Sequence, residues 1–125
     1  MITKFRIDAK SSSTGELLVC EHYRRLGFVA KRFYVLKNIP KGVIRGKHAH
    51  KQLSQVFVCL QGSLDIRIED CSVSETVHLT EGDALHITPG YWRELSNFMD
   101  GAICLVLADE PYDPNDYVFN KEQLS

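Results

Sequence analysis

The chain has 125 residues, of which 44% are hydrophobic and 25% charged, and its formal net charge at pH 7 is -1. This size and composition predict one soluble globular domain over 1–125 with a single core. The near-neutral charge argues against a broad nucleic-acid-binding surface, which needs a basic excess. The longest apolar run, 102–108, is too short to span a bilayer, and the N-terminus shows no signal-peptide pattern, so no membrane association is expected.

The cysteines predict a reducing compartment. Cys20, Cys59, Cys71 and Cys104 form no Cys-x-x-Cys pair, and two of them lie inside apolar runs as small hydrophobic residues do. Their spacing favours neither a disulfide framework nor a structural zinc site. We therefore expect reduced thiols and a cytoplasmic protein.

In chain order the pattern is almost entirely that of β-strands. Short segments rich in Val, Ile, Phe and Leu alternate with turn signals that contain Gly or Pro, which is typical of an antiparallel sandwich or barrel. Only 12–25 and the tail from Pro114 are expected to hold short helical turns, the latter capped by Asp113 or by the pair at 115–116. The expected strands are 29–37, 55–60, 64–69, 75–79, 84–87 and 102–108.

Two of these strands differ in their patterns. Residues 64–69 alternate apolar and polar side chains, so one face should be in water, whereas 56–60 do not alternate and should be covered on both faces. In so small a chain a second subunit can supply one of those covers, and we expect a dimer; the opposite sheet and the tail are the alternative.

A His-x-His pair, His48 and His50, follows the strand-like residues from Arg45. Because side chains on a strand alternate, both imidazoles should lie on one face, where they can bind a metal or transfer protons. The position expected to supply a third metal ligand carries Gln55, which favours proton transfer.

The spacing around this pair resembles the two cupin motifs. His-x-His is followed by Gln55 and Gly62 at the separations of the first motif, and Gly82, Thr88, Gly90, Arg93 and Asn97 keep the spacing of the second. Thr88 replaces the usual Pro, and Arg93 replaces the metal-binding His. The resemblance implies an all-β fold, a small cupin of the double-stranded β-helix or jelly-roll type, in a single domain.

The ligand set argues against a bound metal. A guanidinium cannot ligate a cation and would repel it, and two imidazoles with a neutral amide suit zinc or iron poorly. A cupin without activity, whose histidines merely fill the barrel, is a second alternative, but paired histidines beside Arg45 and Lys47 are poor apolar filling.

A narrower resemblance covers nearly the whole chain. Residues 30–35 (AKRFYV), 45–51 (RGKHAHK), 53–56 (LSQV), 91–98 (YWRELSNF) and 112–117 (YDPNDY) are similar to the nucleotide-sugar 3,4-ketoisomerase family of FdtA-like and WxcM-like cupins. That family carries Gln at the position of Gln55. The resemblance implies a dTDP-4-keto-6-deoxy-D-glucose substrate, a C3 ketone product, a homodimer with exchanged strands, and no metal or other cofactor. It also implies a place in deoxyamino-sugar biosynthesis for a surface polysaccharide such as lipopolysaccharide.

One position departs from the family. Relatives often carry Arg before a Gly near the N-terminus, where it helps to hold the pyrophosphate, but this chain has Thr14 before Gly15. That phosphate contact is then absent or supplied by another residue such as Lys10. The resemblance therefore implies the identity of the nucleotide less directly than it implies the fold.

Moving a ketone from C4 to C3 needs a base that titrates near neutrality and a donor for the developing enediolate oxygen. We expect His48 or His50, preferably His48, to be the base, with the other orienting it. Tyr34 is a candidate acid, and Arg45 is expected to stabilise negative charge on the sugar or phosphate. Each of these two residues can instead have a purely structural role. Tyr34 can belong to the core, and Arg45 can be an exposed charge on the surface. The candidate substrate-binding residues are Gln55, Arg93, Arg32 and Trp92, although Arg32 can equally be structural and Trp92 can equally be core.

Three other functions remain open from the residues alone. A metal-dependent cupin enzyme and a non-catalytic sugar-nucleotide-binding cupin would share this fold. An epimerase would begin with the same proton abstraction beside a ketone. The residues do not determine whether the product has the galacto or gluco configuration at C4.

Overall fold

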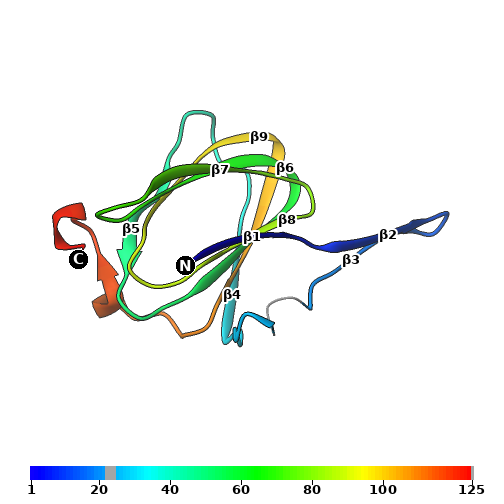
Figure 1. The fold of residues 1–125 in the computed structure, drawn as a ribbon. Coiled ribbons are helices and arrows are strands. Elements are labelled where there is room, and N and C mark those ends of the chain that lie inside the picture. The colour runs from blue at the N-terminus through cyan, green and yellow to red at the C-terminus, as the bar shows by residue number, and fades with distance from the viewer. Residues whose placement is uncertain (22–24, 125) are drawn as a thin grey trace.

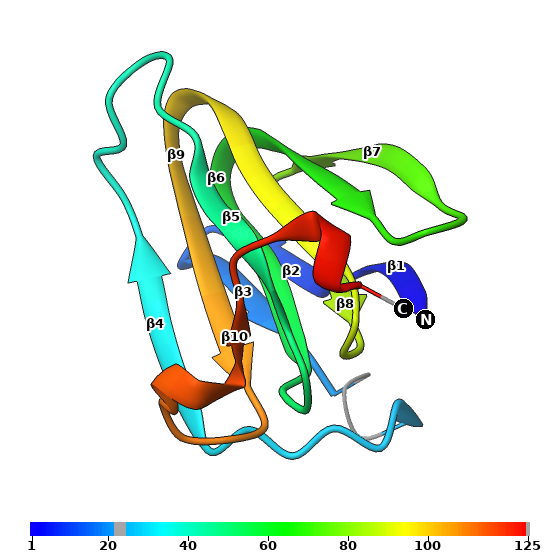
Figure 2. The same ribbon diagram turned by 90° about the vertical axis from the view of Figure 1, so that its left-hand side faces the viewer.

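The computed structural model describes residues 1–21 and 25–124, and these form antiparallel strands with two 3-10 turns near the C-terminus. The main sheet has the order β1-β8-β6-β9-β5-β10, with β4 on β9 and β7 on β6. It curves over on itself, so that β7 lies far from β4 in both views (Figure 1, Figure 2). The elements are β1 (Ile2–Arg6), β2 (Asp8–Ser12), β3 (Gly15–Val19), β4 (Arg32–Leu36), β5 (Arg45–His50), β6 (Gln55–Glu69), β7 (Ser74–Thr80), β8 (Asp83–Ile87), β9 (Trp92–Ala108), η1 (Pro114–Asp116), β10 (Tyr117–Val118) and η2 (Lys121–Gln123).

Two long strands organise the sheet. One edge of β9 pairs with β6 along nearly its whole length, and its other edge pairs first with β5 and then with β4. The opposite edge of β6 pairs with β8 and then with β7. The all-β jelly-roll expectation is therefore confirmed, and every strand that carries a candidate site residue lies beside β9 or on it.

The sequence pattern predicts a turn at 61–63, between the expected strands 55–60 and 64–69, and this prediction is wrong. Gly62 lies inside the continuous strand β6, where the β6–β9 register shifts on either side of it. Its φ of +69° is in the region that favours glycine, and an added Cβ would stand 2.3 Å from the Met99 carbonyl oxygen. Gly62, which the sequence pattern assigns to a turn, therefore lies at a bulge in β6 where the sheet bends.

The ends of the chain also differ from the sequence expectation. Residues 15–19 of the expected helical stretch form β3, while residues 22–24 lie outside the described part. Strands β1 and β2 were not anticipated, because β2 is mostly polar and the two apolar residues of β1, Ile2 and Phe5, do not alternate. The tail does hold the expected helical turns, and the Asp113 side chain caps η1 by accepting from the backbone N–H of Asn115.

Apolar side chains fill the interior and also cover one outer face. Leu64, Ile66 and Ile68 point into the main core, while the intervening positions of β6 are partly or fully exposed, as the alternation predicts. Val56 and Val58 face the other way, against a cluster that includes Ile7 and Phe28. Phe57 and Cys59 face the main core instead, so residues 56–59 are covered on one face by the barrel interior and on the other by this chain's own N-terminal region.

The hairpin β2–β3 projects away from the barrel (Figure 1). Its strands pair with each other and make no ladder with the main sheet. Every residue of β2 is exposed, and Leu17 of β3 is 55% exposed. None of the described helices is long and apolar enough to cross a membrane.

Gly62→Ala should lower stability by about 2 kcal/mol or more, because the new methyl group meets a backbone carbonyl and the positive φ is strained. The measurement is the urea midpoint at unchanged m-value. Gly42→Ala is the matched control: Gly42 also has a positive φ, +84°, but no atom lies within 4 Å of the added Cβ. Equal midpoints for the two variants would contradict the close approach at Gly62.

Candidate functional site

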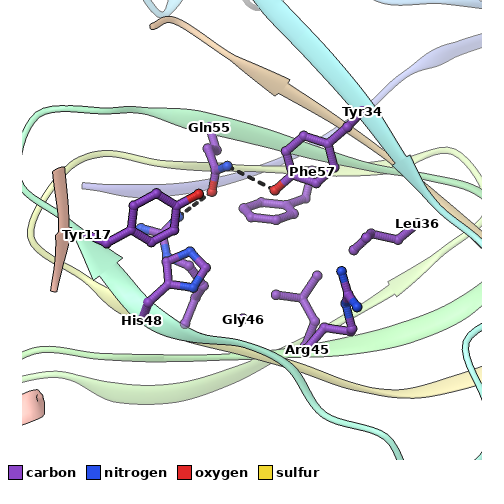
Figure 3. Close-up of a pocket in the computed structure, with 10 residues that line it drawn as sticks. Tyr34, Leu36, Arg45, Gly46, His48, Gln55, Phe57 and Tyr117 are labelled. Atoms are coloured by element: carbon purple, nitrogen blue, oxygen red, sulfur yellow. Dashed lines mark hydrogen bonds between the residues drawn. The ribbon is translucent and has the colours of Figure 1, made fainter. Parts of the chain in front are cut away.

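A pocket of about 190 Å³ opens into one end of the barrel. Its walls come from β4, β5, β6, β9 and β10, which brings together segments from 34 to 117 (Figure 3). Most candidate residues line it: Tyr34, Arg45, His48, Gln55 and Arg93, together with Leu36, Gly46, Phe57, Leu95 and Tyr117. A space of this size suits a single sugar ring rather than a whole nucleotide sugar.

Strand alternation brings the two imidazoles together. The Nε2 atoms of His48 and His50 are 3.1 Å apart, and the rings meet edge to face. Gly46, with a φ of +86°, and a register shift between Gly46 and His48 turn the strand at this point. His48 lines the pocket, whereas His50 lies behind it and is 1% exposed.

The tail supplies a third member of this arrangement. Asp116, the last residue of η1, accepts a hydrogen bond from His50 Nδ1 at 3.1 Å. Its carboxylate also accepts the backbone N–H of Gln52 at 2.8 Å and of Leu53 at 3.2 Å. From the sequence, Asp116 is predicted only as a capping residue. Its proximity to His50 depends on the returning tail, for which the resemblance over 112–117 was the available signal.

A buried guanidinium closes the base of the pocket. Arg93 is 1% exposed and donates to Gln55 Oε1 at 2.6 Å and to the Tyr91 carbonyl oxygen. Gln55 in turn donates through Nε2 to the Tyr34 hydroxyl at 3.1 Å (Figure 3). Burial lowers the pKa of Arg93 to about 10, so it keeps its positive charge at neutral pH.

Burial and this charge act on the titratable groups of the pocket. Burial lowers the pKa of His48, and Arg93 lowers it further, while a backbone hydrogen bond with Gly46 opposes the shift. The pKa of His50 falls to about 4, mainly through burial and then through Arg93 and His48, against the opposing effect of Asp116. Burial also raises the pKa of Tyr34. At neutral pH the site therefore holds two neutral imidazoles and a neutral phenol beside the buried cation Arg93.

The remaining candidates lie outside the pocket wall. The Arg32 guanidinium stands 5.5 Å from the ring centre of Tyr34 and 5.8 Å from that of Tyr112, and its buried Nε has no hydrogen-bond partner. Trp92 is 6% exposed, packs with Ala49 and Val118, and donates to Glu94. The Trp92 ring thus lies in a hydrophobic cluster, as the core alternative predicts, because its position on β9 points it away from the pocket.

The arrangement does not suit a metal cupin. Among residues 1–21 and 25–124, no three His, Cys, Asp or Glu side chains are grouped so as to hold a metal ion. More directly, the Arg93 guanidinium and the Gln55 amide stand at the two other ligand positions of the cupin motifs, and a cation there would meet a fixed positive charge.

Comparison with known proteins agrees with the geometry. Residues 2–125 match the family model described as "FdtA: WxcM-like, C-terminal". A TDP-4-oxo-6-deoxy-alpha-D-glucose-3,4-oxoisomerase from Aneurinibacillus thermoaerophilus is 34% identical over 107 residues, which cover 85% of this chain and 77% of the relative.

Solved structures give the same result. The QdtA sugar 3,4-ketoisomerase from Thermoanaerobacterium thermosaccharolyticum, in complex with TDP, has a TM-score of 0.89 and 34% identity over 97% of this chain and 89% of its own. The WlaRB TDP-quinovose 3,4-ketoisomerase from Campylobacter jejuni has a TM-score of 0.89 and 33% identity over 98% and 95% of the two chains. With its fold, its pocket and the match over 2–125, the chain belongs to the FdtA/WxcM-like family of sugar-nucleotide 3,4-ketoisomerases.

Proposed function

We propose that this protein moves the keto group of dTDP-4-keto-6-deoxy-D-glucose from C4 to C3 by acid–base catalysis without a metal. The observation that carries the proposal is the pair of neutral imidazoles, one in the pocket wall and one behind it, beside a buried guanidinium. A QdtA variant has been solved in complex with TDP-4-keto-6-deoxyglucose, and the curated relative is named for the same reaction. The 190 Å³ pocket would take the sugar, with the nucleotide outside it.

The reaction needs two proton transfers at carbon and no external oxidant. A base removes the proton from C3, the electron pair forms a C3–C4 double bond, and O4 takes a proton to give an enediol. O3 then loses its proton while C4 receives one, which leaves a ketone at C3 and a hydroxyl at C4. A base positioned between C3 and C4, with a nearby acid for the oxygens, is sufficient for both steps.

His48 is the better candidate for the base. His50 is buried, and both of its ring nitrogens are occupied, by Asp116 and by His48. His48 uses Nε2 for that contact and lines the pocket, where its ring can meet a substrate. Its lowered pKa keeps the ring unprotonated at neutral pH, as a base must be.

The other pocket residues suit complementary roles. The raised pKa of Tyr34 keeps its hydroxyl protonated, so it can donate to a sugar oxygen that gains negative charge. Arg45 is exposed at the pocket wall, where it can bind the sugar or the phosphate, and Arg32 offers a second cation near Tyr34 and Tyr112. Gln55 and Arg93 position Tyr34 and complete the interior face.

A homodimer with exchanged strands is part of the proposal. The projecting β2–β3 hairpin has no partner strand among the described residues outside the hairpin itself. Among the described residues, β4 pairs with a strand on one edge only, and that strand is β9. β4 also exposes the side chains of Phe33 (67%) and Val35 (43%). A partner's hairpin added to this edge would cover both features.

The cellular setting follows from the same chemistry. All four cysteines are free, which supports a reducing compartment and hence the cytoplasm. A 3-keto sugar nucleotide is a suitable substrate for amination, which supports a role in making a deoxyamino sugar for a surface polysaccharide such as lipopolysaccharide.

Wild-type protein incubated with dTDP-4-keto-6-deoxy-D-glucose should form the 3-keto isomer, detectable by NMR. His48→Asn should lower kcat by at least about 100-fold, and His50→Asn by less, because loss of the base removes the proton acceptor itself. His78→Asn is the matched control, since that exposed histidine pairs with Asp65 on the barrel surface. Tight TDP binding without turnover by wild type, or solvent deuterium at C5, would instead indicate a binding module or an epimerase.

Arg93→Met should raise the pKa of both His48 and His50, because the guanidinium charge opposes protonation of each imidazole. The pH titration of the imidazole signals by NMR measures this. Arg45→Met removes a cation from the pocket wall that is not a cause of either shift, and it should leave both values in place. Unchanged or lower values in Arg93→Met would contradict the electrostatic role given to Arg93.

Light scattering should give a mass in solution of twice the 14.2 kDa of the chain. Phe33→Glu should convert the dimer to monomer, since it places a charge on the edge strand proposed to receive the partner's hairpin. Val73→Glu makes the same kind of change in the β6–β7 turn, far from β4, and should stay dimeric. A monomeric wild type would refute the dimer and leave the isomerase proposal standing.

A further inference from the structure

The tail places one carboxylate behind the two imidazoles. The Asp116 side chain is 11% exposed and accepts from His50 Nδ1, and His50 Nε2 lies 3.1 Å from His48 Nε2. The three side chains form one line from the tail to the pocket wall, with Asp116 at its inner end and His48 at the substrate end.

The proton positions along this line follow from what each group can donate. A carboxylate accepts only, so the hydrogen on His50 must be on Nδ1. A neutral imidazole carries one N–H, which leaves His50 Nε2 as an acceptor. The contact between the rings then requires His48 to donate through Nε2, which leaves Nδ1 unprotonated although the Gly46 backbone also acts on this ring as an acceptor.

We propose that Asp116 is a positioning residue that sets the tautomers of both histidines, so that His48 presents an unprotonated Nδ1 to the substrate. The inference rests on the proposed isomerase function and adds a residue that touches neither substrate nor the reacting atoms. When His48 Nδ1 takes the C3 proton, the resulting imidazolium keeps its Nε2–H on His50, and the Asp116 carboxylate faces the positive charge through that ring.

The surroundings hold Asp116 in place independently of His50. Backbone N–H groups of Gln52 and Leu53 donate to its two oxygens, and its own carbonyl accepts from the N–H of Lys51. The residues that follow pair with β5, as Tyr117 opposes His50 and Val118 opposes Ala49. So many contacts to one short segment of backbone give the carboxylate a defined orientation toward Nδ1.

The chain also offers a reason why this placement is not merely structural. The Tyr117 ring contacts both imidazoles, and among residues 1–21 and 25–124 the charged side chains that act on the pKa of His50 are Arg93 and Asp116, so Asp116 is the anion that faces the pair. A neutral amide at position 116 would keep only one of the two oxygens that accept the backbone N–H groups of Gln52 and Leu53. Only a carboxylate both compels Nδ1 protonation of His50 and balances a proton on His48.

Asp116→Asn is the decisive variant. The amide can still accept a backbone N–H through its oxygen, but its NH₂ group would face His50 Nδ1 and favour the opposite tautomer. His50 would then donate through Nε2, and His48 would carry its hydrogen on Nδ1, where the lone pair is needed. We expect kcat to fall by about 100-fold or more with KM changed little, and the acid limb of kcat to move to lower pH because a negative charge beside the imidazoles is lost.

Asp113→Asn is the matched control. Asp113 begins the same 3-10 turn, loses the same charge on substitution, and has no contact with His50; Asn also caps well, so the turn should be kept. Its kcat should stay within about twofold of the wild-type value. The acid limb of its kcat–pH profile should lie at the same pH as in wild type. An equal loss in both variants would mean that tail structure, not the carboxylate at 116, supports activity, and would overturn the proposal.

The tautomers are measurable without any variant. In wild-type protein labelled with ¹⁵N-histidine, long-range ¹H–¹⁵N spectra at neutral pH should show protonated Nδ1 for His50 and protonated Nε2 for His48. The opposite tautomer at either ring would overturn the proposal, even if Asp116→Asn fails to fold. Because the spectra need no substrate, they separate failure of this inference from failure of the isomerase function, which would appear as absent turnover by wild type.

Discussion

The structure depends on a guanidinium buried at the base of the pocket. Arg93 is held by Gln55 Oε1 and by the Tyr91 carbonyl, and its charge faces the imidazoles across the barrel interior. A charged group in such a place is costly to desolvate unless its donors are satisfied. The neutral amide of Gln55 accepts a hydrogen bond from Arg93 through its oxygen and donates one to the Tyr34 hydroxyl through its nitrogen. The pair replaces the two ligand positions that complete a cupin metal site and makes proton transfer the chemistry that remains.

The residues of this site come from both the barrel strands and the C-terminal tail. Strands β5, β6 and β9 carry the histidines, Gln55 and Arg93 on adjacent ladders, so their relative positions follow from backbone pairing. The tail returns along β5 and adds Asp116 from behind and Tyr117 from the side, where its ring contacts both imidazoles. Beyond it, Lys121 bonds Glu69 and lies near Glu94 and over Trp92, which anchors the segment to the barrel. Trp92 also packs against Val118 of this tail.

Local pattern predicted the parts of the site that lie within one strand or repeat a fixed spacing. The alternation of β5 places both imidazoles on one face, and the motif spacing from His48 to Arg93 anticipates a pocket that β5, β6 and β9 share. Other features depend on contacts that sequence spacing does not contain. Asp116 meets His50 across 66 positions, and Gly62 reads locally as a turn although the strand continues through it. Strand β1 has only two apolar residues, Ile2 and Phe5, which do not alternate, so it is recognisable only by its pairing with β8.

The central claim is that the imidazole pair works without a metal because a fixed cation stands where ligands would be. The most direct measurement is kcat for dTDP-4-keto-6-deoxy-D-glucose after exhaustive chelation, with metal content determined on the same sample. The account predicts full activity at a metal content far below one equivalent. Loss of activity that is restored by one equivalent of iron, zinc or manganese would contradict it.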